Sequence, residues 1–180
     1  NKVNIKNHYL VNTVDSYYFK YGIKNTEYQF LEAIGVIYNM NLEDILELIT
    51  DTLKKDKNNI LFTSLESGDI SSKFSSREEY INFINTNKFI GYDLIGDLLS
   101  KQGIVSVNGI NYYIFEKSSK VVKKELEKKY TQDDYNLICS KFENDIYKED
   151  EERDNIILLK DGKSYYPIFN IEKKKTERNS

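Results

Sequence analysis

The chain contains very few of the residues that build disulfides, metal sites and rigid turns. Its 180 residues include one cysteine, one histidine, one proline and no tryptophan. A single cysteine cannot form an internal disulfide, and one cysteine with one histidine cannot make a Cys/His zinc site. The glycine patterns of phosphate-binding and dinucleotide-binding loops are missing too. We therefore expect neither a metal ion nor a cofactor.

The sequence also lacks an apolar run long enough to cross a membrane and the pattern of a signal peptide. We therefore expect no membrane contact and an intracellular location. The length is normal for one domain, and 39% hydrophobic with 31% charged residues fits a globular protein. We expect a lead-in at 1–25, with a short extended piece near 17–21, one domain at 26–172 and a basic tail at 173–180. From the start at Asn1 we expect the chain to be a piece excised from a longer protein.

The net charge of −3 gives no overall attraction to nucleic acid, but the charges are unevenly placed. Residues 143–154 are mainly acidic, whereas 117–129 and 173–178 are basic. Such runs are usually solvated surface. If the first basic run touches phosphates, the candidate contacts are Lys120, Lys123, Lys124, Lys128 and Lys129.

Helical periodicity dominates the first half of the chain. Apolar residues spaced by three or four predict helices over 26–39, 42–55, 77–85 and 91–101. Asn25 or Thr26, Asn41 and Ser76 are the candidate N-caps, with Glu79 completing a capping box. Gly35 inside the first helix predicts close packing against another backbone. Residues 59–65 are ambiguous between helix and strand.

Strand patterns replace helical ones in the second half. Asn108-Gly109 predicts a hairpin between strands 104–107 and 110–115, and 135–139 reads as a short strand. Residues 154–171 predict a final hairpin around Asp161-Gly162 with two buried arms. Pro167 in its second arm cannot donate a ladder hydrogen bond, so it should lie at an edge or a bulge. Helices followed by a mostly antiparallel sheet define an α+β fold.

Residue patterns alone identify no catalytic centre. Asp93 and Asp97 lie one helical turn apart, which is typical of a solvated helix face. Glu116-Lys117 after a strand, with Asp93 upstream, is faintly like a nuclease motif, but that motif needs one residue between acid and lysine. His8 and Cys139 show no sign of being paired, and Cys139 among apolar neighbours is expected to be a buried hydrophobe.

Several short segments nevertheless resemble, in their order, the C-terminal part of the large subunit of the poxvirus-type early transcription factor and its homologues in other large DNA viruses. They are Tyr21-Gly22-Ile23, Phe30-Leu31, Ala33-Ile34, Gly109-Ile110-Asn111, Tyr113 to Glu116, Leu137-Ile138-Cys139, Ile157 to Lys160, and Tyr165 to Ile168. The cysteine-rich segment that lies upstream in that family is absent. The acidic residue usual between Tyr and Pro is missing, since Tyr166 is followed directly by Pro167.

That resemblance implies a part in recognising early viral promoters. The implied partners are a helicase-like small subunit, the viral RNA polymerase and promoter DNA. The implied locations are the viral factory in the host cytoplasm and the virion.

The order of elements is also similar to the ovarian-tumour (OTU) type of papain-like deubiquitinase. In that family a nucleophilic Cys opens a buried helix with the pattern Cys-Leu-Phe-x-Ala-Ile, and a His-Tyr pair begins the last strand. The matching stretches here are Gln29 to Ile34 and Tyr165-Tyr166. Gln29 and Tyr165 cannot supply the thiolate and the imidazole, so the resemblance implies a dead enzyme.

We therefore expect a non-catalytic interaction domain of a viral transcription initiation factor with a degenerate OTU-like fold. The alternatives are an active hydrolase acting on ubiquitin-like conjugates or on nucleic acid, with Cys139 as the only thiol, and a structural module of a larger viral protein. An OTU-like fold requires Gln29 and Tyr165 to lie close together. We expect the first helix to pack on the final hairpin through a set of apolar side chains: Phe30, Leu31 and Ile34 against Ile157, Leu159, Tyr166 and Ile168.

Overall fold

The computed structural model describes residues 10–12, 16–24, 27–87, 89–118, 134–138 and 153–172. Its helices are α1 (Gln29–Tyr38), α2 (Leu42–Lys55), α3 (Ile60–Ser64), α4 (Ile70–Lys73), α5 (Arg77–Thr86) and α6 (Tyr92–Ser100). Its strands are β1 (Leu10–Asn12), β2 (Ser16–Lys20), β3 (Ile110–Ser118), β4 (Asp134–Ile138), β5 (Asp154–Asp161) and β6 (Ser164–Glu172). Helices thus fill the first half and most strands the second, which confirms the α+β class.

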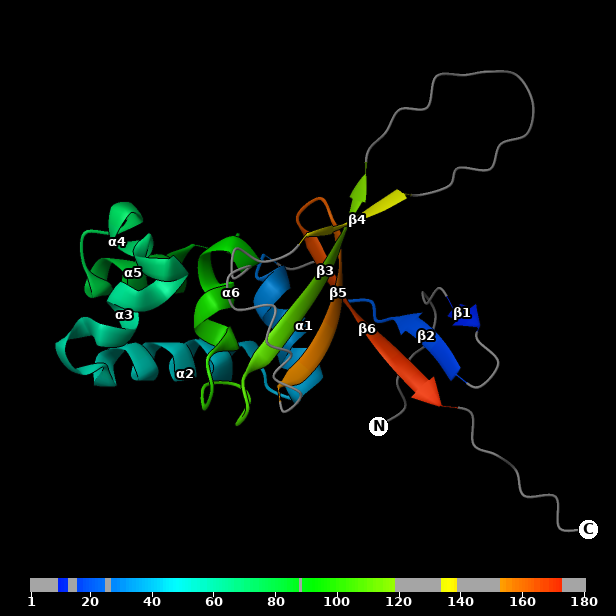
Figure 1. Ribbon diagram of the computed structural model, residues 1–180, viewed down its shortest axis with the longest axis horizontal. Coiled ribbons are helices and arrows are strands. Elements are labelled where there is room, and N and C mark those ends of the chain that lie inside the picture. Colours follow the sequence, from blue (N-terminus) through cyan, green and yellow to red (C-terminus); the bar gives the residue numbers. More distant parts are fainter. Residues whose placement is uncertain are drawn as a thin grey trace, which may run out of the picture.

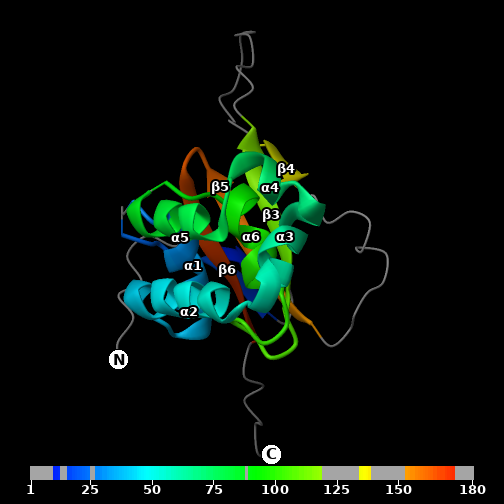
Figure 2. The ribbon, with the colours of Figure 1, turned by 90° about the vertical axis from the view of Figure 1, so that its left-hand side faces the viewer.

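All six strands join one mixed sheet in the order β1-β2-β6-β5-β3-β4. Every neighbouring pair is antiparallel except β3 and β5, which run parallel. The helices gather on one side of β3 and β5, as Figure 1 shows edge-on and Figure 2 from the helical side. β1 and β2, from the stretch expected as a lead-in, extend the sheet beyond β6.

Local sequence signals account for where the main helices begin. Asn41 caps α2, accepting from the Asp44 backbone N–H at 2.9 Å, while the Asp44 carboxylate accepts from the Asn41 backbone. Ser76 caps α5 by accepting from the Glu79 backbone at 3.1 Å, but the Glu79 carboxylate turns to Ser75 instead of completing the box. The predicted N-caps Asn41 and Ser76 are confirmed, but the one predicted at Asn25 or Thr26 is wrong, because α1 begins only at Gln29, after Tyr28.

Gly35 marks the closest approach of α1 to another backbone segment. A Cβ on this residue would lie 2.5 Å from the Met40 carbonyl oxygen and 3.1 Å from Ile45 Cδ1. The Met40 backbone N–H in turn donates to the Gly35 carbonyl at 2.8 Å. The predicted close packing is confirmed, and it tightens the turn that leads from α1 into α2.

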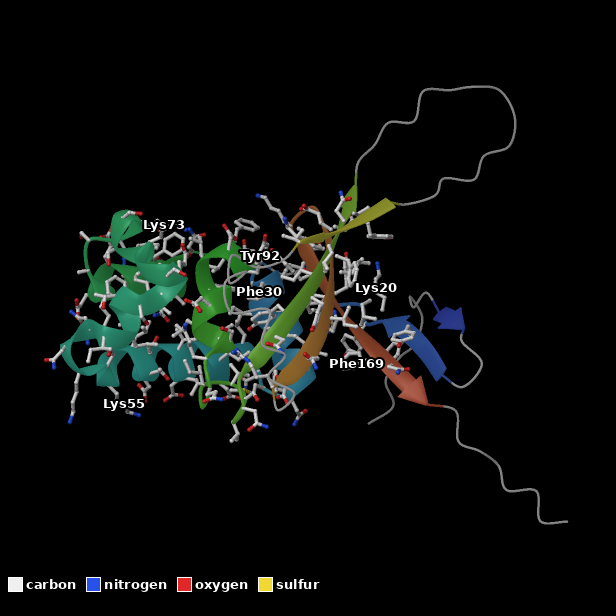
Figure 3. The ribbon with its side chains drawn as sticks, in the orientation of Figure 1. Lys20, Phe30, Lys55, Lys73, Tyr92 and Phe169 are labelled. Atoms are coloured by element: carbon white, nitrogen blue, oxygen red, sulfur yellow. The ribbon has the colours of Figure 1, made fainter. Side chains whose placement is uncertain are left out.

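Helix α1 lies at the centre of the core, between the other helices and the sheet. Phe30, Leu31 and Ile34 are completely buried, and the same core contains Ile156, Leu158 and Tyr165 from the final hairpin. Figure 3 shows Phe30 on the helical side of β3 and β5. The final hairpin and its contact with α1 therefore match the expectation.

The prediction of which face of the hairpin meets α1 was wrong. The side chains predicted to meet α1 lie one residue out of phase with the buried ones and point to the opposite side of the sheet. They are Ile157, Leu159, Tyr166 and Ile168, all only half-buried and outside the core cluster. A one-residue change of phase exchanges the two faces of a strand. In the unbroken apolar run Ile156 to Leu159, no alternation in the sequence indicates which residues face the helices.

The prediction of a hairpin at Asn108-Gly109 was also wrong. Residues 104–108 form a loop, and β3 begins only at Ile110. The Ser106 carbonyl accepts from the backbone N–H groups of Gly103 and Gly109 at 2.8 and 3.3 Å, which folds the loop on itself. The partners of β3 are instead β5 on one side and β4 on the other.

The final turn and its proline fit the ladder of the sheet. The turn lies at Gly162-Lys163, one residue later than expected, and Gly162 has a φ of 60°. Pro167 lies one residue beyond the last β2–β6 pair, Lys20 with Ile168, so its missing N–H interrupts no pairing there. Its carbonyl still accepts from the Tyr21 backbone at 2.8 Å.

Candidate binding cleft at the start of helix α1

Gln29 and Tyr165 line the same open cleft, which has a volume of about 220 Å³. The walls come from the start of α1, the segment that leads into α6, and the turn of the final hairpin. The other lining residues are Glu27, Phe89, Ile90, Gly91, Asp93, Lys160, Gly162 and Lys163. The starts of the first helix and of the last strand thus border the same cleft.

Packing behind the cleft explains why these two elements meet. Phe30, the second residue of α1, contacts the ring of Tyr165 edge-on with centroids 5.1 Å apart. It also contacts Tyr112 of β3 at 5.8 Å. Tyr165 lies opposite Lys160 in the hairpin register. A completely buried aromatic side chain therefore fixes the start of α1 against the sheet, one residue beyond Gln29.

The phenol of Tyr165 stays neutral at ordinary pH. Burial raises its pKa well above the usual 10.0; a backbone hydrogen bond from Tyr92 opposes this, and the nearby Asp93 carboxylate adds to it. The hydroxyl lies beside the start of α6, since a Cβ on Gly91 would come within 3.4 Å of it. Tyr165 therefore cannot accept a proton at neutral pH as an imidazole would.

Gln29 lines the cleft, and its buried side-chain oxygen is unsatisfied. Its side chain is only 7% exposed, and its Oε1 atom has no hydrogen-bond partner. Such a buried amide oxygen costs free energy unless a donor reaches it. Tyr28, which precedes α1, makes no side-chain cap, whereas at the start of α6 the Tyr92 backbone N–H donates to the Tyr165 hydroxyl.

The charged groups around the cleft are mixed in sign. Lys160 forms an ion pair with Glu116 and lies 6.0 Å from the centroid of the Tyr92 ring. Lys163 lies over the Phe89 ring at 4.4 Å. Glu27 and Asp93 supply two carboxylates. No group of three or more potential metal ligands occurs among the described residues, so this part of the chain offers no metal centre.

The other acidic candidates are not gathered into a catalytic site. The prediction that Asp97 lies on a solvated helix face is wrong, because this residue is only 4% exposed. Its carboxylate accepts from the Glu66 backbone at 2.7 Å and pairs with Lys101 at 2.9 Å. It thereby supports a turn in which Glu66 and Ser67 have positive φ angles, a role that helical spacing could not reveal. Asp93, by contrast, lines the cleft.

The remaining sequence candidates lie outside the described residues. They are His8, Cys139 and the five lysines Lys120, Lys123, Lys124, Lys128 and Lys129. Of the acid–lysine pair in β3, Glu116 bonds to Lys160 on the helical side, while Lys117 belongs to the alternate face. The hairpin lysines Lys160 and Lys163, which the structure adds to the cleft, carry no motif that would single them out in sequence.

Comparison with known proteins identifies a viral relative. No family model matches the chain, and no solved structure does. The chain is 41% identical over 169 residues, or 94% of its length, to "Uncharacterized protein R327" of Acanthamoeba polyphaga mimivirus, and spans 11% of that protein. None of the described helices is long and apolar enough to cross a membrane. The chain is thus similar to a small part of a long protein of a giant virus.

Proposed function

We propose that the chain is a non-catalytic interaction domain of a larger viral protein, with a degenerate OTU-like fold whose cleft binds a protein partner. One observation carries the proposal: Gln29 and Tyr165, which the OTU resemblance aligns with the thiol and the imidazole of a papain-like hydrolase, line one cleft. In that alignment neither position carries its reactive group.

The properties of the two side chains favour binding over chemistry. An amide has no nucleophilic form at neutral pH, and burial keeps the Tyr165 phenol protonated. The buried Oε1 of Gln29 has no partner, and a bound main chain could donate to it if the amide turned toward the cleft. An extended peptide segment of a protein partner is the ligand that best fits these groups.

The finer assignment is to a viral transcription initiation factor. The ordered segments shared with the early transcription factor large subunit support it, together with the viral origin of the relative. Its partners would be the viral RNA polymerase and the helicase-like small subunit, or promoter DNA. Its locations would then be the viral factory in the host cytoplasm and the virion.

The partner assignment is tested by pull-down with the viral polymerase and small subunit. We expect the domain to recover at least one of them. Gln29→Arg, which fills the cleft with a charged side chain, should lower recovery at least about fivefold because a bound segment loses its place. Ile60→Ala is the matched control, since Ile60 is 67% exposed on α3, away from the cleft. Recovery of neither partner would contradict the transcription assignment.

The absence of catalysis is tested separately with a ubiquitin-based suicide probe that labels thiol nucleophiles. We expect no labelling of the wild-type chain. Labelling that disappears in Cys139→Ser would show an active cysteine hydrolase and overturn the proposal of a non-catalytic domain. A ubiquitin-like protein bound without labelling would instead identify the partner class of the cleft.

A further inference from the structure

Two dipeptides in the chain, Asn108-Gly109 and Asp161-Gly162, place a glycine after asparagine or aspartate. The backbone nitrogen of such a glycine can attack the side-chain carbonyl carbon of the residue before it, because glycine has no side chain to shield the nitrogen. The product is a five-membered succinimide ring, which water opens to aspartate or isoaspartate. In an unfolded chain at neutral pH the asparagine reacts faster, because ammonia leaves more readily than water.

The fold opposes this reaction at Asn108-Gly109. Gly109 is buried, and a Cβ built on it would lie 2.7 Å from the Ser100 carbonyl oxygen. Its backbone N–H donates to the Ser106 carbonyl at 3.3 Å, and its own carbonyl accepts from the Asp154 backbone at 3.0 Å. The nitrogen must give up its hydrogen bond and turn toward the Asn108 side chain before the ring can close. Asn108 is therefore protected unless the loop opens.

The surroundings of Asp161-Gly162 are the opposite, because this pair lies at the turn of the final hairpin. Both residues are exposed, and a Cβ on Gly162 would meet no atom within 4 Å. The strand pairing ends with Asp161 opposite Ser164, and no acceptor for the Gly162 N–H occurs in the parts of the chain that the structure describes. Over the same ranges the Asp161 carboxylate makes no hydrogen bond or ion pair. The two reacting groups are thus free to meet without unfolding.

We propose that Asp161 is a modification site, at which the folded protein isomerises spontaneously to isoaspartate. The Gly162 nitrogen bonds to the Asp161 side-chain carbon Cγ, and the N–H proton leaves with the carboxyl hydroxyl as one molecule of water. A second water then adds to the backbone carbonyl carbon of Asp161 and breaks its bond to the Gly162 nitrogen. That carbon becomes a free carboxylate, and the main chain now runs through Cβ and Cγ. No oxidant is needed, and the mass of the chain is unchanged.

Isomerisation at Asp161 changes one wall of the cleft. Gly162 and Lys163 line the cleft, and Lys163 Nζ lies 4.4 Å from the centroid of the Phe89 ring. Isoaspartate adds one carbon to the main chain, so the two-residue connection between β5 and β6 no longer has the length that this register requires. Lys163 is then displaced from Phe89. The modification site rests on the exposure of the turn, so it does not depend on a partner in the cleft.

The test is incubation of the complete folded chain for several weeks at mildly acidic pH and body temperature, followed by peptide mapping. This pH keeps the intrinsic rates at Asp161 and Asn108 comparable, because protonation of a carboxyl group favours loss of water, whereas base promotes attack on an amide. We expect isoaspartate to accumulate at Asp161, without a change of mass, at least about fivefold faster than Asn108 deamidates. In urea this difference should disappear, because unfolding removes the protection of Asn108.

Asp69 is the matched internal control. It is also exposed but precedes the β-branched Ile70, whose side chain shields the backbone nitrogen, so it should not convert. Asp161→Glu keeps the charge but would need a six-membered ring, so conversion at this position should be lost, and urea unfolding checks that the variant keeps the fold. Absence of isoaspartate at Asp161 in the folded chain, equal accumulation at Asp69, or faster conversion of Asn108 without urea would each overturn the proposal.

Discussion

The two faces of the sheet differ in what covers them, although the same strands supply both. On the helical side, Ile114 and Leu158 are completely buried beneath the core helices. On the other side, which no described helix covers, their chain neighbour Tyr113 is exposed and Leu159 is half-buried. β3 and β5 therefore carry more apolar side chains than the core buries. One face supports the fold, and no described helix covers the other.

The largest expected effect comes from truncating adjacent leucines on the two faces. Leu158→Ala should lower the free energy of unfolding by about 2 to 5 kcal/mol, because it leaves a cavity under α1 and the other core helices. Leu159→Ala removes the same atoms from the face that no described helix covers, and it should lower the free energy of unfolding by about 1 kcal/mol or less. Urea denaturation of both variants measures the difference. Equal losses would mean that the two faces are buried alike in solution.

The stability of the protein at alkaline pH tests the burial of two tyrosine phenols on the helical side of the sheet. Burial raises the pKa of Tyr112 and of Tyr165 above the usual 10.0. A raised folded-state pKa contributes stability that is complete below the unfolded value and is lost as pH rises through the folded one. The urea midpoint should therefore hold to about pH 9 and fall above about pH 10, while these two phenols ionise only on unfolding. A midpoint that is flat through about pH 11 would contradict this.

Sequence reasoning found the helices because their signals are local. The Asn41 and Ser76 caps and the periodic apolar residues lie within one turn or a few turns of the helices they predict. The sheet was harder, because its pairing depends on distant segments. Nothing near β3 indicates that it runs parallel to β5, and Asn108-Gly109 had the local form of a hairpin without a strand before it.

The cleft could be anticipated only in part. Resemblance to a family directed attention to Gln29 and Tyr165, and the structure brings them to one cleft. The Lys160 and Lys163 side chains, and the segment before α6, reach the same place through the hairpin register and the helix packing. These relations link positions far apart in the chain, so composition and spacing carry no sign of them.

The smallest effect on stability is expected at the cleft itself, from Gln29→Ala. Gln29 is nearly as buried as the core residues beside it, so burial alone would predict a substantial loss. Its Oε1 atom, however, has no hydrogen-bond partner, and removing a buried unsatisfied acceptor offsets much of the lost packing. We expect the free energy of unfolding to change by less than about 1 kcal/mol, while partner recovery through the cleft falls. A loss of about 2 kcal/mol or more in urea denaturation would show that Gln29 supports the fold, as the leucine on the helical face does, and not ligand binding.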